Sequence, residues 1–394
     1  MVMQETMAVP AGSGSAAATS GAAPGAAAAH SGHLFHPVVD FFCLGGGSLI
    51  IFALLALFRP PLEHYQTVAG LMLMVAHLIN HPHFAHSYQI FYRHFGEKAL
   101  GSHYDPLLRL RYLIAGVAVP LALFAYFLTV VLLQDLRALG FAVNVMFFLV
   151  GWHYVKQGYG MLIVCSVLKR QFFNAMEKKI LLVNAYVVWV ADWMIANWTV
   201  HHYNMWGLAY YTFDLPQPLV LVAIALCAGS TAAMLWMMMR KWWAEGSRLP
   251  LNGVVAYLVT LYAWLLLNAD PLFLLVIPAC HSLQYLLVVW RYQLNAERDR
   301  AGQAAETADG RPRSGSPKAR FAGFLAVGLL LGYFGFWGLP KLLAATVPVD
   351  QAVFGPTLFL FVCWVFINVH HYFLDNVMWR RGNPDTGRYL FAHR

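Results

Sequence analysis

Histidine is unusually frequent for a chain so poor in charge, with 17 His against 18 Asp and Glu together. Ten of these histidines fall within long apolar runs, where a polar side chain is costly and typically marks a functional site. They are His77, His81, His83, His86, His153, His201, His202, His281, His370 and His371. Neutral imidazole is the commonest metal ligand, and one shared ion satisfies several rings at once. The pattern therefore predicts a metal centre assembled from distant parts of the chain.

The spacing of these histidines supports the same interpretation. His77 and His81 are four residues apart, so they share one face of a helix. Pro82 interrupts that helix and is expected to direct the next two histidines of the run toward the same ion. His370 and His371 diverge by about 100° on a helix, so we expect them to serve two ions, or one ion and a supporting role.

Other polar residues within the apolar runs are candidates for an additional ligand or for contacts that orient the ligands. These are Asp192, Asp375, Lys156, Gln157, Gln284 and Tyr285. Asp375 lies four residues after His371, where its carboxylate can bind the ion or orient that imidazole. Lys156 lies one turn after His153, where it either contacts an anion or extends toward the membrane surface. No catalytic residue beyond the metal ligands is apparent.

The donor set indicates which ion to expect. Nitrogen ligands with one carboxylate fit iron, zinc or copper, and the five cysteines form no CxxC pair that would add soft ligands. A structural zinc site takes four ligands, whereas eight or more candidates favour two or more ions. We therefore predict iron, with zinc, copper and haem as the alternatives.

Composition indicates the class of protein that must hold these residues. Of 394 residues, 60% are hydrophobic and only 11% are charged, against about 25% charged in ordinary soluble domains. This excludes a soluble enzyme and a disordered chain, and it favours an all-α, polytopic integral membrane bundle of about ten transmembrane helices. The predicted spans are 37–58, 65–92, 110–133, 139–168, 180–203, 217–239, 252–268, 271–293, 321–340 and 352–378.

The positive charges predict the orientation of this bundle. Of the 26 Lys and Arg, 22 lie in five segments, 93–111, 169–179, 240–248, 291–320 and 380–394. The positive-inside rule places these segments and both termini in the cytoplasm, and the membrane is the plasma (inner) membrane if the protein is bacterial. The basic residues line membrane exits and are not interleaved with exposed aromatic residues, so we expect no nucleic-acid partner. In this topology His201 and His202 lie near the opposite face, and whether they join the site stays open.

Two segments differ in composition from the rest. Residues 1–34 are rich in Ala, Gly and Ser and are expected to form a disordered tail. Residues 35–394 form one predicted membrane domain, which contains a polar, flexible cytoplasmic linker at 295–319.

Three short motifs resemble those of the histidine-box membrane di-iron enzymes, which include fatty-acid desaturases, hydroxylases and alkane monooxygenases. His77 to His81 reads HxxxH, and the pairs His201-His202 and His370-His371 match the end of the HxxHH boxes, although Trp198 and Ile367 stand where those boxes begin. The resemblance implies an oxidoreductase that uses O2 to oxidise a lipid-like substrate.

The expected partners are a hydrophobic small molecule, membrane lipids and an external electron donor, since no dinucleotide-binding motif is present. Two other functions fit intramembrane histidines. One is a proton- or metal-coupled transporter, and the other is a b-haem electron-transfer protein.

Overall fold

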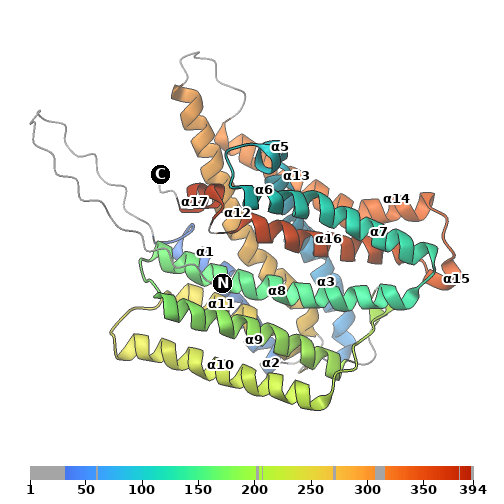
Figure 1. Cartoon of the computed structure of the whole chain (residues 1–394), viewed down its shortest axis with the longest axis horizontal. Coiled ribbons are helices and arrows are strands. Elements are labelled where there is room, and N and C mark those ends of the chain that lie inside the picture. Colours follow the sequence, from blue (N-terminus) through green and yellow to red (C-terminus); the bar gives the residue numbers. More distant parts are fainter. Residues whose placement is uncertain are drawn as a thin grey trace, which may run out of the picture.

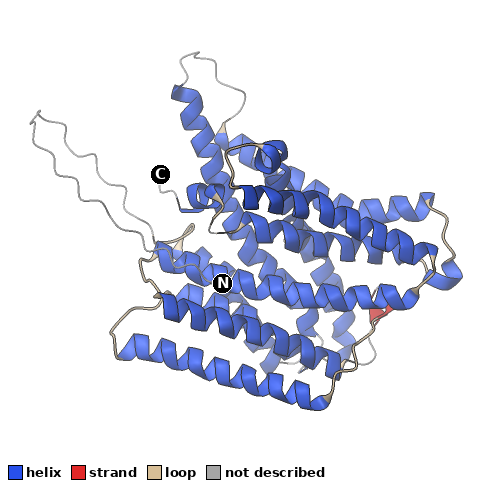
Figure 2. Ribbon diagram, in the orientation of Figure 1, coloured by secondary structure: helices blue, strands red, loops and turns tan. Residues whose placement is uncertain are grey.

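The computed structural model describes residues 32–58, 61–200, 204–205, 207–268, 272–306, 316–380 and 382–391. Over these residues the chain is all-α, as the sequence predicts (Figure 1). The one sheet in this described part is an antiparallel pair of two-residue strands, β1 (Asn204–Met205) and β2 (Leu208–Ala209) (Figure 2).

The first half of the chain builds the helices that carry His83 and His153. Its helices are α1 (Pro37–Phe41), α2 (Gly47–Leu57), α3 (Tyr65–Leu78), α4 (Asn80–Tyr92), α5 (Phe95–Leu100), α6 (Pro106–Leu113), α7 (Val119–Leu132), α8 (Leu136–Leu168) and α9 (Ala175–Thr199). Side chains fix several starts. The Asp135 carboxylate accepts a hydrogen bond from Ala138 N at 2.9 Å before α8, and Asn174 with Glu177 forms a capping box before α9.

The second half adds the helices that close the bundle around the first. They are α10 (Gln217–Trp243), α11 (Leu251–Tyr262), α12 (Leu272–Glu306), α13 (Pro317–Tyr333), α14 (Leu339–Thr346), α15 (Gln351–Phe354), α16 (Leu358–Met378) and α17 (Pro384–Phe391). Helices α8, α9 and α10 lie side by side (Figure 1). Helix α16 packs against both α8 and α4. Helix α12 also contacts α4.

Eight described helical segments are long and apolar enough to cross a membrane: Pro37–Leu57, Pro106–Leu132, Leu136–Leu168, Ala175–Thr199, Gln217–Trp243, Leu272–Gln303, Pro317–Thr346 and Leu358–Met378. Each overlaps one of the ten predicted spans. The other two predictions differ in form. Predicted span 252–268 is the shorter apolar segment Leu251–Leu266, and predicted span 65–92 is two helices, α3 and α4.

The break between α3 and α4 lies at Ile79, one turn before the proline that the sequence singles out. Pro82 has no N–H to donate, and its ring would clash with the carbonyl four residues earlier, that of Leu78. The helix therefore ends at Leu78 and restarts at Asn80, and His83 N donates to Ile79 O at 3.2 Å. This restart sets the direction in which α4 presents its histidines.

Helix α13 lies very close to α4 because two glycines face it. A Cβ on Gly328 would lie 2.2 Å from the His86 ring, and a Cβ on Gly332 would lie 2.7 Å from the His81 carbonyl carbon. The spacing of these glycines is that of the GxxxG motif, which permits close approach of helix backbones.

Several predictions fall partly outside the described residues. Residues 1–31 of the predicted tail, positions 307–315 of the predicted linker, and the pair His201 and His202 are not described. The described ends of the linker are helical, because α12 continues to Glu306 and α13 begins at Pro317.

Candidate metal centre

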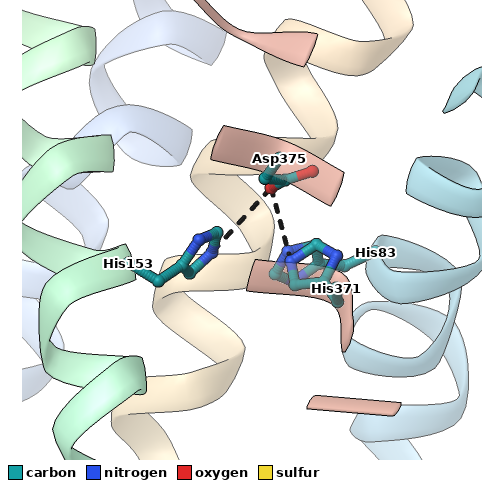
Figure 3. A group of neighbouring side chains, drawn as sticks. All are labelled: His83, His153, His371 and Asp375. Atoms are coloured by element: carbon teal, nitrogen blue, oxygen red, sulfur yellow. Dashed lines mark ion pairs between the residues drawn. The ribbon is translucent and has the colours of Figure 1, made fainter. Parts of the chain in front are cut away.

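Four predicted site residues from three helices converge on one buried point. His83 comes from α4, His153 from α8, and His371 and Asp375 from α16, and in Figure 3 the three rings and the carboxylate face one another. One ligand atom from each residue lies within 4.8 Å of one ligand atom from every other. The i, i+4 spacing of His371 and Asp375 places both on one face of α16, as expected.

The distances within this group are close to those that one shared metal ion requires. His371 Nε2 lies 3.3 Å and His153 Nε2 lies 3.9 Å from Asp375 Oδ2. Metal–nitrogen bonds of about 2.0–2.1 Å in a tetrahedral site separate neighbouring donors by about 3.4 Å. His371 Nε2 and Asp375 Oδ2 already have this separation, and no pair would have to close by more than about 1.4 Å.

Among the described residues, the atoms that face the centre have no other partner. His83 Nε2, His153 Nε2, His371 Nε2 and Asp375 Oδ2 are buried and form no hydrogen bond. Leaving a buried polar atom unpaired is costly, and an unpaired carboxylate costs more. A cation at the centre would satisfy all four atoms at once, and this fit is the main reason to assign a metal site.

A hydrogen-bond relay orients the His83 ring toward the centre. Ser282 Oγ donates to Asn80 Oδ1 at 2.6 Å, so the same hydroxyl must accept the bond from His83 Nδ1 at 2.7 Å. The proton of the neutral imidazole is therefore on Nδ1, and the lone pair on Nε2 faces the other ligands. Outer contacts of this kind fix the tautomer and ring orientation of metal ligands.

His281 is a fifth imidazole next to the four-residue group. Its ring centroid lies 5.0 Å from that of His153 and 5.3 Å from that of His83. Both of its ring nitrogens are buried and have no hydrogen-bond partner in the described part of the chain. The ring stacks on Tyr154 at 3.6 Å. His281 therefore contacts the centre from α12, although its nitrogens lie outside the four-residue group.

The remaining described histidines of the prediction lie away from this group, each with its own contacts. His77 Nδ1 bonds Leu73 O at 2.7 Å, and His81 stacks on Phe336. His86 Nδ1 bonds Gln89 Oε1 at 2.8 Å. These rings of α3 and α4 point toward helix backbone or toward the α13 side of the bundle.

His370 differs from its neighbour His371 because it faces away from the centre. Its Nδ1 bonds the Tyr88 hydroxyl at 2.9 Å, and its Nε2 bonds Ala115 O at 3.0 Å. Ala115 belongs to the π-helical segment Ile114–Ala118, which joins α6 to α7. The structure thus separates the two adjacent rings into a ligand candidate and a helix-linking residue.

The predicted supporting residues also divide into those beside the centre and those that link helices. Tyr285 contacts Asp375, and Lys156 Nζ donates to Asn376 Oδ1 on α16. Gln157 donates to His281 O and to Gln284 Oε1, and Gln284 donates to Leu44 O, so the two amides link helices.

Asp192 lies apart from the centre. It is on α9, and its Oδ1 is buried and has no hydrogen-bond partner among the residues that the structure describes. It is not one of the four residues whose ligand atoms converge.

Three residues that support the centre were not among the sequence candidates: Ser87, Ser282 and Trp379. Ser282 bonds His83, while Ser87 and Trp379 bond the Tyr285 hydroxyl. The only sequence signal is their helical spacing, since Ser87 lies four residues after His83 and Ser282 lies three residues before Tyr285.

No family model, curated protein or solved structure matches this chain. Functional proposals therefore depend on the geometry of the centre and its surroundings.

Proposed function

We propose that this protein is an integral membrane oxidoreductase with a non-haem iron centre held by His83, His153, His371 and Asp375. The observation that carries the proposal is the convergence of three unpartnered imidazole nitrogens and one unpartnered carboxylate oxygen at a single buried point. Iron accepts this donor set, and a bound iron ion would supply the activation of O2.

The surface of the bundle supports placement in a membrane. Large apolar side chains are exposed along the outer helices, among them Leu121 and Phe124 on α7 and Leu226 and Trp236 on α10. Soluble monomers rarely expose apolar patches on this scale. We propose that eight to ten segments span the bilayer, that both termini are cytoplasmic, and that the substrate is a lipid-like molecule reaching the centre from the bilayer.

The described residues contain one group able to hold an ion, so the proposal is for one ion per chain. The prediction of two or more ions remains untested. Zinc is the second candidate, because three nitrogens and one oxygen also make a complete four-ligand zinc site. A closed zinc site would stabilise the fold without redox chemistry.

The adjacent pair His370 and His371 offers a matched test. The full chain, purified in detergent from iron-replete cells, is analysed for metals and by iron spectroscopy. We expect about one iron per chain in the wild type, little in His371→Gln, and wild-type content in His370→Gln, whose ring has other partners. Stoichiometric zinc without iron would overturn the iron assignment. Equal metal content in all three proteins would overturn the site.

Redox activity needs a separate measurement. The iron-loaded, reduced protein is mixed with O2 and a membrane lipid extract, and O2 uptake and oxidised lipid are measured. Uptake that depends on His371 supports the oxidoreductase proposal. A protein that binds iron but whose iron is not oxidised by O2 would contradict it.

A further inference from the structure

Among the described residues, three cations on or beside the helices around the metal centre have no acidic partner. Lys156 on α8 is one turn, about 4.5 Å of helix rise, from His153. The Lys156 ammonium contacts Asn376, one helical turn before Arg380, and α16 packs against both α8 and α6, the helix that carries Arg111. The like charges of Arg111 and Arg380 therefore act on Lys156. All three side chains are half-buried. We call Lys156, Arg111 and Arg380 the cationic cluster.

Several other cations in the protein are paired with acids, and the cationic cluster contrasts with these. Lys241 Nζ lies 3.0 Å from Glu177, Arg320 Nε lies 2.6 Å from Glu297, and Arg388 Nη2 lies 2.5 Å from Asp299. Within the described residues, no member of the cationic cluster forms an ion pair.

The contacts that Lys156 does make are with neutral groups. Its Nζ donates to Asn376 Oδ1, the residue after the candidate ligand Asp375, and lies 4.5 Å from the centroid of the Trp152 ring. These contacts fix the ammonium beside the centre and leave its charge uncompensated. Burial lowers the pKa of the Arg380 guanidinium, and the like charge of Arg111 lowers it further. Three half-buried positive charges in this arrangement favour an anion between them.

The side chains around the cluster indicate what kind of molecule the anionic group belongs to. Arg111 is flanked on α6 and the following turn by Leu107, Leu110 and Ile114, all of which are exposed apolar side chains. An anion that binds here therefore lies next to a surface suited to a hydrocarbon chain. Basic residues at such a boundary attract the anionic groups of amphiphiles.

We propose that Lys156, Arg111 and Arg380 bind the oxyanionic head group, a carboxylate or a phosphate, of an amphiphile whose chain lies along α6, and that this amphiphile is the substrate of the metal centre. The second part deepens the proposed function and rests on it. The first part needs no metal, because none of the three cations is a ligand of the centre.

The head-group preference can be measured by spin-label electron paramagnetic resonance. The full chain is reconstituted in phosphatidylcholine bilayers after treatment with a chelator. The probes are nitroxide-labelled stearic acid, its methyl ester and labelled phosphatidic acid. We expect the protein to associate with at least one of the anionic probes several-fold more strongly than with the ester. Removing one cation should lower that preference about fivefold, the equivalent of about 1 kcal/mol.

Matched variants separate this cluster from charge in general. Lys156→Gln and Arg380→Gln should lose the preference, and Lys156→Arg should keep it. Arg137→Gln should also keep it, because Arg137 is a cation on the same helix α8 that lies over an aromatic ring, Phe141, away from the cluster. Preference for stearic acid, phosphatidic acid or both identifies the source of the oxyanion and supports the proposal. No preference, or one that survives Lys156→Gln and Arg380→Gln, would overturn it.

A second arm tests whether the bound amphiphile lies at the metal centre. Loading the centre with a paramagnetic ion should broaden the nitroxide signal of the bound probe, and Lys156→Gln should remove this broadening. Selective binding without broadening would overturn the substrate assignment and leave the metal site in place. A protein that binds no metal but keeps its head-group preference would refute the proposed function and retain the cationic cluster.

Discussion

Tyr285 donates a hydrogen bond from its hydroxyl to Asp375 Oδ1 at 2.8 Å, while Asp375 Oδ2 faces the imidazoles of the centre. The two carboxylate oxygens therefore have different tasks. One is held by α12, and the other is free to bind an ion. The Tyr285 hydroxyl is itself held by Trp379 Nε1, which donates to it at 3.3 Å, and by Ser87. The orientation of the carboxylate thus depends on residues that do not touch the centre.

Tyr285→Phe removes this support and keeps the ring. We expect metal affinity to fall by about 10–100-fold, the usual cost of losing a hydrogen bond to a ligand, without loss of fold. The dissociation constant is measured by competition with a chelator of known affinity. Tyr292→Phe is the control, because Tyr292 lies two turns further along α12 and its ring packs edge-on against Trp379. Equal affinities for all three proteins would show that Asp375 does not need Tyr285.

Ser282→Ala should act on the opposite side of the centre. Without the hydroxyl, His83 Nδ1 loses its acceptor and the ring can adopt the wrong tautomer, so we again expect about 10–100-fold weaker metal binding. Ser282→Thr keeps the hydroxyl and should recover most of the affinity. Chelator competition on the three proteins provides the measurement. A Ser282→Ala protein with wild-type affinity would mean that packing alone orients His83.

The sequence predicted all four residues of the centre but could not separate its three histidines from the other described histidines of the prediction. Helical periodicity shows which residues share a face, but not which neighbour that face meets. His370 and His371 are adjacent and chemically identical, but only His371 faces the centre. The Tyr88 hydroxyl and the carbonyl of Ala115, in the π-helical segment, lie beside His370 alone. These contacts join residues more than 250 positions apart, and no local pattern encodes them.

The fold, like the site, was predictable where the signal lies in neighbouring residues and not where it depends on distant contacts. The length of the apolar runs predicted the long helices. Such a run can form a helix whether its side chains face lipid or another helix, so the prediction does not require knowledge of the neighbouring helix. Span 65–92 also carries a local signal in Pro82, but the break falls at Ile79, since the ring acts on the carbonyl one turn earlier. The sequence indicated only one of the three residues of the cationic cluster. Lys156 stood out in an apolar run, whereas Arg111 and Arg380 resembled ordinary cytoplasmic charges.

Gly332→Ala should disturb the centre through the helix that carries His83. The added Cβ would lie 2.7 Å from the His81 carbonyl carbon, and backbone atoms cannot move aside as a side-chain end can. We expect a loss of about 1–3 kcal/mol in stability and weaker metal binding. Gly323→Ala on the same helix α13 is the control, because a Cβ there has open space. Thermal unfolding in detergent compares the two, and equal midpoints would argue against close α4–α13 packing.

Lys98 gives the protein a pH-dependent stability outside the predicted spans. Its Nζ is buried and donates to Ile90 O at 2.8 Å and Phe91 O at 3.3 Å, and burial lowers the pKa of the ammonium to about 8. The unfolded chain keeps this pKa near about 10.4, so between these values the unfolded state binds more protons and stability rises with pH. We expect the wild-type unfolding temperature to rise relative to that of Lys98→Met between about pH 8 and pH 10. Parallel curves across that range would contradict the lowered pKa, because all other titrating groups are common to both proteins.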